Sequence, residues 1–190
     1  MKYKDYIIFI VKFLGIFCLL YFGTLAVIGL SVPQGYYSPF IAQYLNYVDW
    51  MRASLLWGAK GLLALGGYKT YLPDKYHLLM KNGSGVHMVY TCIGYGVMSF
   101  WGAFIIANKG SWKKKLVWII GGWLAIWCIN VVRLSLLVLA INNSWQMPLG
   151  LDHHTWFTIA AYILIFILIY FYDRSSKKYL QNLILLNILK

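Results

Sequence analysis

Four long runs of apolar residues divide the chain, and polar or charged segments separate them. The runs cover residues 6–30, 88–107, 116–141 and 155–172. A helix needs about 20 mostly apolar residues to cross the hydrocarbon core of a bilayer. The pattern therefore predicts an all-α fold, a polytopic integral membrane bundle with four transmembrane helices. We expect residues 1–190 to form a single membrane-embedded domain.

The segment 31–87 between the first two runs is not expected to be a plain loop. Its middle, residues 44–67, is amphipathic, and Arg52 and Lys60 interrupt any full membrane span. This pattern is typical of helices that lie in the membrane interface. We expect interfacial or re-entrant helices here, and two further crossings would raise the span count to six. Residues 173–190 predict a short amphipathic helix on the cytoplasmic surface.

The composition agrees with a membrane protein. Of the 190 residues, 61% are apolar and 12% are charged, whereas an ordinary globular domain has about a quarter charged residues. The 9 Trp, 16 Tyr and 10 Phe are too many for a disordered chain. The net charge of +12 comes from short basic clusters between the apolar runs, which we interpret as topology determinants and anionic-lipid contacts. These features exclude a soluble enzyme and predict no nucleic-acid partner.

The basic residues also predict the orientation. The N-terminus, the connection 108–115 and the tail 173–190 are rich in lysine and arginine. The segment 31–87 holds only five basic residues in a longer stretch, and 142–154 holds none. Because basic loops stay in the cytoplasm, we expect both termini to be cytoplasmic and the segments 31–87 and 142–154 to face outward.

Arg133 is the most costly side chain in the apolar runs. It lies eight residues before the outer end of the run 116–141, about 12 Å along a helix. Asn130 lies three residues earlier on the same helix face. Outward snorkelling or a packing ion pair would be the structural explanation for this arginine. Ionisable groups at membrane depth usually mark functional sites, and we interpret Arg133 as one.

The three cysteines differ in their surroundings. Cys18 and Cys128 lie among apolar neighbours in the middle of their runs, which predicts small buried packing residues. Cys92 follows the glycine-containing stretch 82–85 and lies near the outer end of the run 88–107. The odd number and wide spacing argue against a disulfide framework. Cys92 is a candidate nucleophile, although taken alone a packing role is the simpler interpretation.

All four histidines fall in outward segments or at their borders: His77, His87, His153 and His154. The strongest feature is the sequence Asp-His-His at residues 152–154, at the outer mouth of the last run. An adjacent acid can orient an imidazole and raise its basicity.

Cys92, Arg133 and a histidine are thus expected at one depth, within about two helical turns of the outer surface. A nearby guanidinium favours a thiolate over a thiol, and it can also hydrogen-bond an oxyanion. A histidine can protonate a leaving amine and later deprotonate an incoming nucleophile. This combination predicts nucleophilic acyl transfer.

The order of these motifs resembles the exosortase/archaeosortase family. The matching sequences are Thr-Cys-Ile-Gly at 91–94, Asn-Val-Val-Arg-Leu at 130–134 and Asp-His-His-Thr-Trp-Phe at 152–157. The resemblance covers about residues 88–172. The small size and the aromatic richness resemble the compact exosortases of Bacteroidetes-type bacteria.

The resemblance implies a cysteine transpeptidase, a thiol protease of the bacterial inner membrane with its active site on the periplasmic side. Its partners would be membrane lipids and exported proteins that carry a C-terminal sorting signal: a short motif, a transmembrane helix and a basic tail. The enzyme would cleave this signal through a thioester intermediate and transfer the protein to a surface anchor or to water. No cofactor or metal is implied.

The family's functional residues fall on Cys92 as nucleophile, Arg133 as arginine and His154 as histidine. The family motif can also be aligned so that its histidine falls on His153, so both histidines remain candidates. Further supporting residues would be Asn130 and Asp152.

Two other functions fit parts of the pattern. Haem or a metal ion could bind to His87, His153 and His154 in a membrane subunit, because imidazoles on facing helices hold haem. Adjacent histidines point to different sides of a helix, which weakens joint ligation by the last two. A non-catalytic export or assembly factor would use Arg133 and the histidines for packing alone.

Overall fold

The computed structural model describes residues 3–33, 36–145 and 153–188, and within the last helix it describes the side chains of only some residues. Contacts divide the chain into two compact units, Met1–Gln146 and Met147–Lys190. In the second unit the structure describes one helix, α5 (His153–Ile188). The elements of the first unit are α1 (Tyr3–Ser31), the π-helical turn η1 (Ile41–Leu45), α2 (Tyr47–Leu65), β1 (Thr70–Tyr71), β2 (His77–Met80), β3 (Gly85–His87), the 3₁₀ turn η2 (Tyr90–Ile93), α3 (Tyr95–Ala107) and α4 (Trp112–Asn142).

The helical fold class is confirmed, but four transmembrane spans are not. Within the described residues, α1 and α4 are long and apolar enough to cross a membrane. They match the predicted runs 6–30 and 116–141 to within a few residues. The 13 residues of α3 reach only about 20 Å at 1.5 Å per residue, less than the roughly 30 Å of hydrocarbon.

The helix predicted for residues 88–107 begins seven residues later than expected, at Tyr95. The first part of the run forms η2, and Gly94 after it has φ +85°. This left-handed conformation is costly for residues with a β-carbon but open to glycine. Gly94 therefore separates the turn from the helix.

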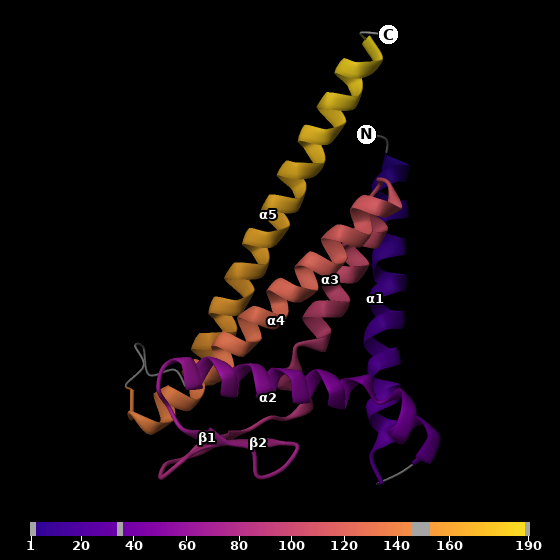
Figure 1. Cartoon of the computed structure of the whole chain (residues 1–190). Coiled ribbons are helices and arrows are strands. Elements are labelled where there is room, and N and C mark those ends of the chain that lie inside the picture. The colour runs from indigo at the N-terminus through magenta and orange to yellow at the C-terminus, as the bar shows by residue number, and fades with distance from the viewer. Residues whose placement is uncertain (1–2, 34–35, 146–152, 189–190) are drawn as a thin grey trace. The chain divides into compact units, whose positions relative to one another are not determined.

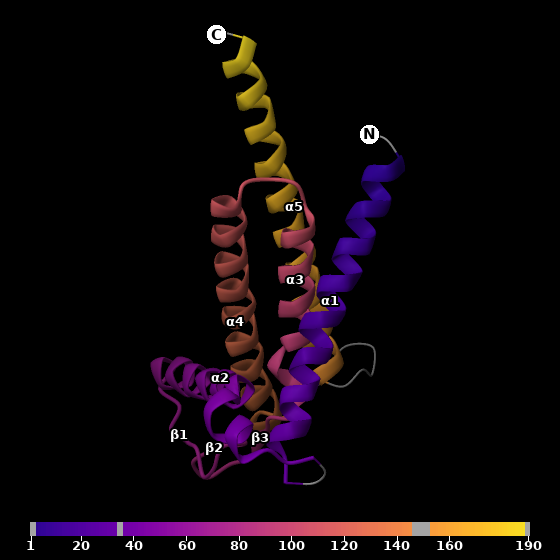
Figure 2. The ribbon, with the colours of Figure 1, turned by 90° about the vertical axis from the view of Figure 1, so that its right-hand side faces the viewer.

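Helices α1, α3 and α4 run side by side (Figures 1 and 2). Phenyl rings spaced four residues apart on α1 contact rings on α3, such as Phe13 on Phe100 with centroids 5.3 Å apart. On the other side of α3, Trp101 is fully buried, and its Nε1 donates to the backbone oxygen of Trp118 on α4 at 2.9 Å. Aromatic packing thus holds the three helices together.

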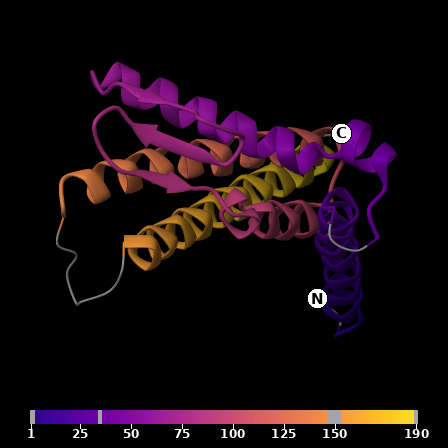
Figure 3. The same cartoon turned by 90° about the horizontal axis from the view of Figure 1, so that it is seen from below.

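Helix α2 confirms the amphipathic helix expected within residues 44–67. It runs across the ends of α1, α3 and α4 rather than parallel to them (Figures 1 and 3). Gly58 allows it to approach α4 closely, because a β-carbon there would lie 2.8 Å from Cγ2 of Val131. Apolar side chains of α2, α4 and the sheet form the core on the buried side of α2, including Val48, Leu55, Leu56, Ala59, Leu63, Leu78, Val86, Leu134 and Val138.

A small antiparallel sheet, which the hydrophobic pattern does not predict, follows α2. Its strand order is β1-β2-β3, and His77 pairs with His87 across β2 and β3. Asn142 at the end of α4 holds the turn between these strands. Its Oδ1 accepts from the backbone N–H of Ser84 at 2.8 Å, and its Nδ2 donates to the oxygen of Ser84 at 3.0 Å.

The tail predicted as a separate amphipathic helix at 173–190 is instead continuous with the preceding apolar run. Helix α5 extends without interruption over 36 residues, His153–Ile188. No glycine or proline occurs between these residues, so nothing in the sequence ends the helix at the change from apolar to polar side chains.

Candidate active site

Cys92 lies in the η2 turn that leads from the sheet into α3, not inside a membrane helix as the sequence predicted. Its backbone N–H donates to the oxygen of Val89 at 3.0 Å, and the next residue, Ile93, is fully buried. The thiol side chain is half-buried. The turn thus anchors the backbone of Cys92 on both sides.

Asn130 of α4 holds this turn from the outside. The side chain of Asn130 is buried, and its Nδ2 donates to the backbone oxygen of Ile93 at 3.3 Å. A β-carbon on Gly94 would come within 2.5 Å of the same nitrogen. The spacing of Asn130 and Gly94 therefore fixes where Cys92 sits relative to α4.

Replacing Gly94 by alanine should shift the turn and lower both stability and the reactivity of Cys92. Gly67 offers a matched control, because it also has a positive φ, +82°, but no atom lies within 4 Å of a β-carbon there. A left-handed residue with a β-carbon costs about 1–2 kcal/mol, and Gly94→Ala adds the collision with Asn130. Thermal unfolding and the rate of Cys92 alkylation would measure the difference. Equal behaviour of the two variants would contradict the proposed contact.

A small cavity brings Cys92 and Arg133 together. Its volume is about 30 Å³, enough for one water molecule. It is lined by Val86, His87, Met88, Cys92, Asn130, Arg133, Leu134 and Leu137. The two residues come from different elements, the η2 turn and α4, and both are partly accessible. A thiol and a guanidinium therefore share a mostly apolar cavity.

His87 also lines this cavity, and the sequence analysis did not connect it with Cys92. Its Nδ1 lies 2.9 Å from Nε2 of His77, whose Nδ1 lies 2.7 Å from a carboxylate oxygen of Asp74. With His77 neutral, its Nδ1–H donates to Asp74, and Nδ1–H of His87 donates to His77. This order leaves a lone pair on Nε2 of His87, the form of imidazole that accepts a proton.

The pKa of the exposed Asp74 carboxyl is lowered, mainly by the hydrogen bond from the backbone N–H of Tyr76 and further by His77. The carboxylate therefore stays charged beside the imidazole of His77. In the sequence, only the short spacing of Asp74 and His77 indicates this row of hydrogen-bonded side chains. The strand pairing that brings His87 to them is a tertiary feature.

The histidine expected from the family motif falls at the start of α5. His153 is the first residue of that helix, while the side chains of His153 and His154 lie outside those that the structure describes. Asp152 lies outside the described residues altogether. The structure thus brings together Cys92, Asn130 and Arg133, three of the predicted site residues.

The other two cysteines do not have the buried packing role expected of them. Cys18 and Cys128 are both exposed, and no disulfide forms in the part of the chain that the structure describes. No group of three or more His, Cys, Asp or Glu side chains is arranged to hold a metal ion among the described residues.

Comparison with known proteins identifies a family. The sequence model of the transmembrane exosortases (Exosortase_EpsH) matches residues 6–172. No curated protein and no solved structure matches the chain. The matched region contains Cys92, Arg133 and His154, and in broad terms it supports a membrane protein with a transpeptidase-like role. Because the match spans most of the 190 residues, the chain belongs to the transmembrane exosortase family.

Proposed function

We propose that this protein is a membrane-embedded cysteine transpeptidase that removes the C-terminal sorting signal of exported proteins and transfers them to a surface anchor. The observation that carries the proposal is the cavity shared by Cys92 and Arg133 in a chain of this family. A thiolate and a guanidinium around a space for one small group suit nucleophilic attack on a peptide carbonyl.

In the proposed reaction the sulfur of Cys92 bonds to the carbonyl carbon of the scissile peptide. Arg133 stabilises first the thiolate and then the negative charge on the carbonyl oxygen. The carbon–nitrogen bond breaks, and a histidine gives its proton to the departing amine. The thioester is then attacked by an amine of the anchor, whose proton passes to the histidine as the thiolate is released. Water in place of the amine would give simple proteolysis.

The proposed orientation places the cavity on the periplasmic side of the bacterial inner membrane and both termini in the cytoplasm. In the first unit, Nζ of Lys109 lies 2.8 Å from a carboxylate oxygen of Asp5. This ion pair joins the N-terminus to the basic connection before α4, at the end of the helices away from the sheet (Figure 2). The cavity lies beside the sheet, at the opposite end of these helices from the ion pair. If the termini are cytoplasmic, the cavity is on the outward side.

We assign proton transfer to His154 from the family motif, with His153 as the other reading of the register. His87 is the alternative that the cavity supports. His154→Gln should slow processing by about 10²–10⁴-fold, the usual contribution of a general acid or base. His87→Gln should have a smaller effect, because the family motif assigns the histidine to position 154 and not to position 87. Processing rates of His154→Gln, His153→Gln and His87→Gln would decide, and a larger loss in His87→Gln would assign proton transfer to His87.

The function is tested by comparing the C-terminal peptides of exported proteins between cells with and without this chain. Mass spectrometry should find a set of proteins that keep a hydrophobic, basic tail only when the chain is missing. A mass added at the new terminus identifies an anchor, and an unmodified carboxyl terminus identifies hydrolysis. Identical termini in both cells would overturn the proposal and favour a haem-binding or an assembly role. A visible absorption band of the purified protein would then indicate haem binding, and its absence would favour the assembly role.

A further inference from the structure

Arg52 of α2 is the most deeply buried charged side chain among the described residues. It is only 1% exposed. Its guanidinium carbon lies 4.5 Å from the ring centre of Tyr76 and 4.2 Å from that of Tyr90. The guanidinium thus lies close to two aromatic rings, one from the residue before β2 and one from the η2 turn. They leave its N–H groups, which lie in the plane, free to point elsewhere.

Those N–H groups make no hydrogen bond with the described residues. The three nitrogens Nε, Nη1 and Nη2 of Arg52 are all buried without such a partner. Asp49 lies 2.9 Å from Nη1 as an ion pair, but without the geometry of a hydrogen bond. A buried charged donor left without an acceptor destabilises the protein more than a neutral one does. An oxyanion accepting from the planar fork would remove this cost.

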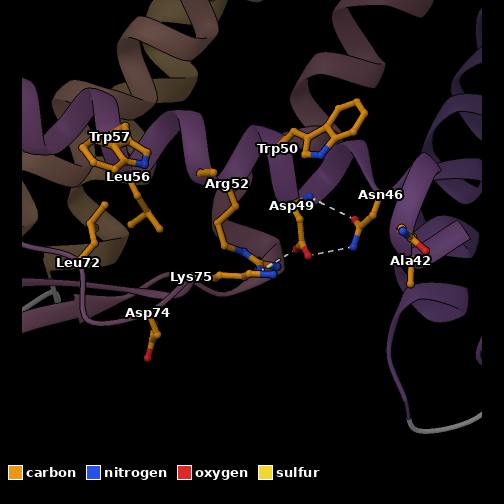
Figure 4. A pocket seen from close by; sticks show the side chains of 12 residues that line it. Ala42, Asn46, Asp49, Trp50, Arg52, Leu56, Trp57, Leu72, Asp74 and Lys75 are labelled. Carbon is orange, nitrogen blue, oxygen red and sulfur yellow. Dashed lines mark hydrogen bonds and ion pairs between the residues drawn. The ribbon is translucent and has the colours of Figure 1, made fainter. Parts of the chain in front are cut away.

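A pocket of about 610 Å³ opens beside Arg52. Its size is in the range of small-ligand sites. It is lined by Ala42, Gln43, Asn46, Asp49, Trp50, Arg52, Ala53, Leu56, Trp57, Leu72, Asp74 and Lys75. Arg52 points from α2 toward the segment that carries Lys75, so two cations belong to the same end of the pocket (Figure 4).

Two carboxylates, Asp49 and Asp74, balance these two cations in formal charge, but both are already engaged by other groups. Asp49 is held by Asn46, whose Nδ2 donates to it at 2.9 Å, and it faces one edge of Arg52. Asp74 also lines the pocket (Figure 4), and its Oδ1 accepts from the backbone N–H groups of Tyr76 and His77. Both carboxylates thus already have partners, whereas the donors of Arg52 have no hydrogen-bond acceptor among the described residues, which favours a ligand that brings an oxyanion acceptor.

Another part of the pocket wall is aromatic and consists of Trp50 and Trp57. Trp50 and Trp57 are 64% and 61% exposed, and they lie on the side of α2 from which the other helices rise (Figures 1 and 4). Exposed tryptophans on a helix lying across the ends of membrane helices are typical of the membrane interface. The pocket thus combines an aromatic wall suited to the membrane interface with an end that carries Arg52 and Lys75.

We propose that this pocket binds the headgroup of a membrane phospholipid, with the phosphate on Arg52 and Lys75 and the start of an acyl chain against Trp50 and Trp57. The aromatic wall distinguishes a lipid from a free phosphate ion, for which the apolar side would serve no purpose. This site is separate from the cavity of Cys92 and does not depend on the proposed cysteine chemistry.

Native mass spectrometry of the purified, delipidated full-length protein in detergent tests this inference. Three probes are added separately: phosphatidylglycerol, diacylglycerol with the same acyl chains, and inorganic phosphate. Phosphatidylglycerol should bind at least about 10-fold more tightly than diacylglycerol, since one well-placed charged contact is worth a factor of this order. Equal binding of both lipids would overturn the proposal. Binding of inorganic phosphate as tight as that of the phospholipid would overturn the assignment to a lipid.

Variants then locate the site. Lys75→Ala should weaken phosphatidylglycerol binding several-fold and fold normally, because Lys75 is exposed. Arg52→Gln should weaken it by about 10-fold or more, and Arg52→Lys should restore part of the loss. Lys60→Ala is the matched control: Lys60 lies on the same helix, over the ring of Trp57 at 4.6 Å, but does not line the pocket. Unchanged binding in Lys75→Ala and Arg52→Gln, or an equal loss in Lys60→Ala, would contradict the site.

Competition with an N-acetylated, C-amidated glutamate peptide separates a lipid from a peptide carboxylate. The peptide should not displace phosphatidylglycerol at millimolar concentration. Displacement by this peptide, with loss of its binding in Arg52→Gln, would overturn the lipid assignment and make the pocket a site for acidic peptides.

Discussion

Exported proteins should keep their hydrophobic, basic tails in cells that carry Cys92→Ala in place of the wild-type chain. Alanine removes the sulfur that forms the thioester, and neither Arg133 nor a histidine can replace it as the nucleophile. Loss of a nucleophile in a catalytic unit lowers the rate by about 10⁶-fold in a well-studied protease, so processing should fall below detection. The C-terminal peptides, measured by mass spectrometry, provide the readout.

Two further cysteines supply controls for this substitution. Cys18→Ala and Cys128→Ala should process normally, because both side chains are exposed and neither lines the cavity. The variant Cys92→Ala should still insert into the membrane, since the side chain is small and only half-buried. In the wild-type protein, Cys92 should react with iodoacetamide faster than the other two thiols. Continued cleavage by Cys92→Ala would exclude this residue as the nucleophile.

Arg133→Gln should slow processing by about 10²–10³-fold, the usual cost of removing one donor from an oxyanion site. Glutamine is shorter than arginine and removes the charge, but it keeps a polar N–H₂ donor group. The charge stabilises the thiolate as well as the oxyanion, so alkylation of Cys92 at neutral pH should slow in the same variant. Measuring both rates separates an effect on the thiol from an effect on the later step.

Two control variants are needed to interpret the result of Arg133→Gln. Arg174→Gln removes an exposed arginine from α5 and should change neither rate. Arg133→Lys should recover part of the activity, because lysine keeps the charge but not the planar donor fork. If Arg133→Gln processed substrate at the wild-type rate and lost only thermal stability, Arg133 would have a packing role instead.

Much of the candidate site can be read from the order of residues along the chain. The spacing of Asn130 and Arg133 places both on one face of a helix, and both line the cavity of Cys92. The contribution of His87 cannot be read in the same way, because it depends on the pairing of two short strands and on a neighbour ten residues away. Short strands carry a weak sequence signal, and their position depends on tertiary contacts.

The burial of Arg52 is another feature that could not be predicted from the sequence. In the sequence Arg52 lies in an amphipathic segment, where it interrupts any full membrane span. In the structure it occupies the buried face with Val48 and Leu55, because Tyr76 and Tyr90 from distant segments cover it. Periodicity could place the residue on a face but could not reveal the aromatic partners that make its burial tolerable.

The sequence by itself determined the helical fold class, the membrane helices α1 and α4, and the family to which the chain belongs. Those features depend on local hydrophobic length and on motifs contained in short segments. Only the tertiary structure decided that residues 88–94 form a turn, that α3 is short, and that a sheet follows α2. These depend on contacts between distant residues, such as Asn130 with Ile93 and Asn142 with Ser84. Local patterns do not encode such pairings, because their energy appears only when the separate segments meet.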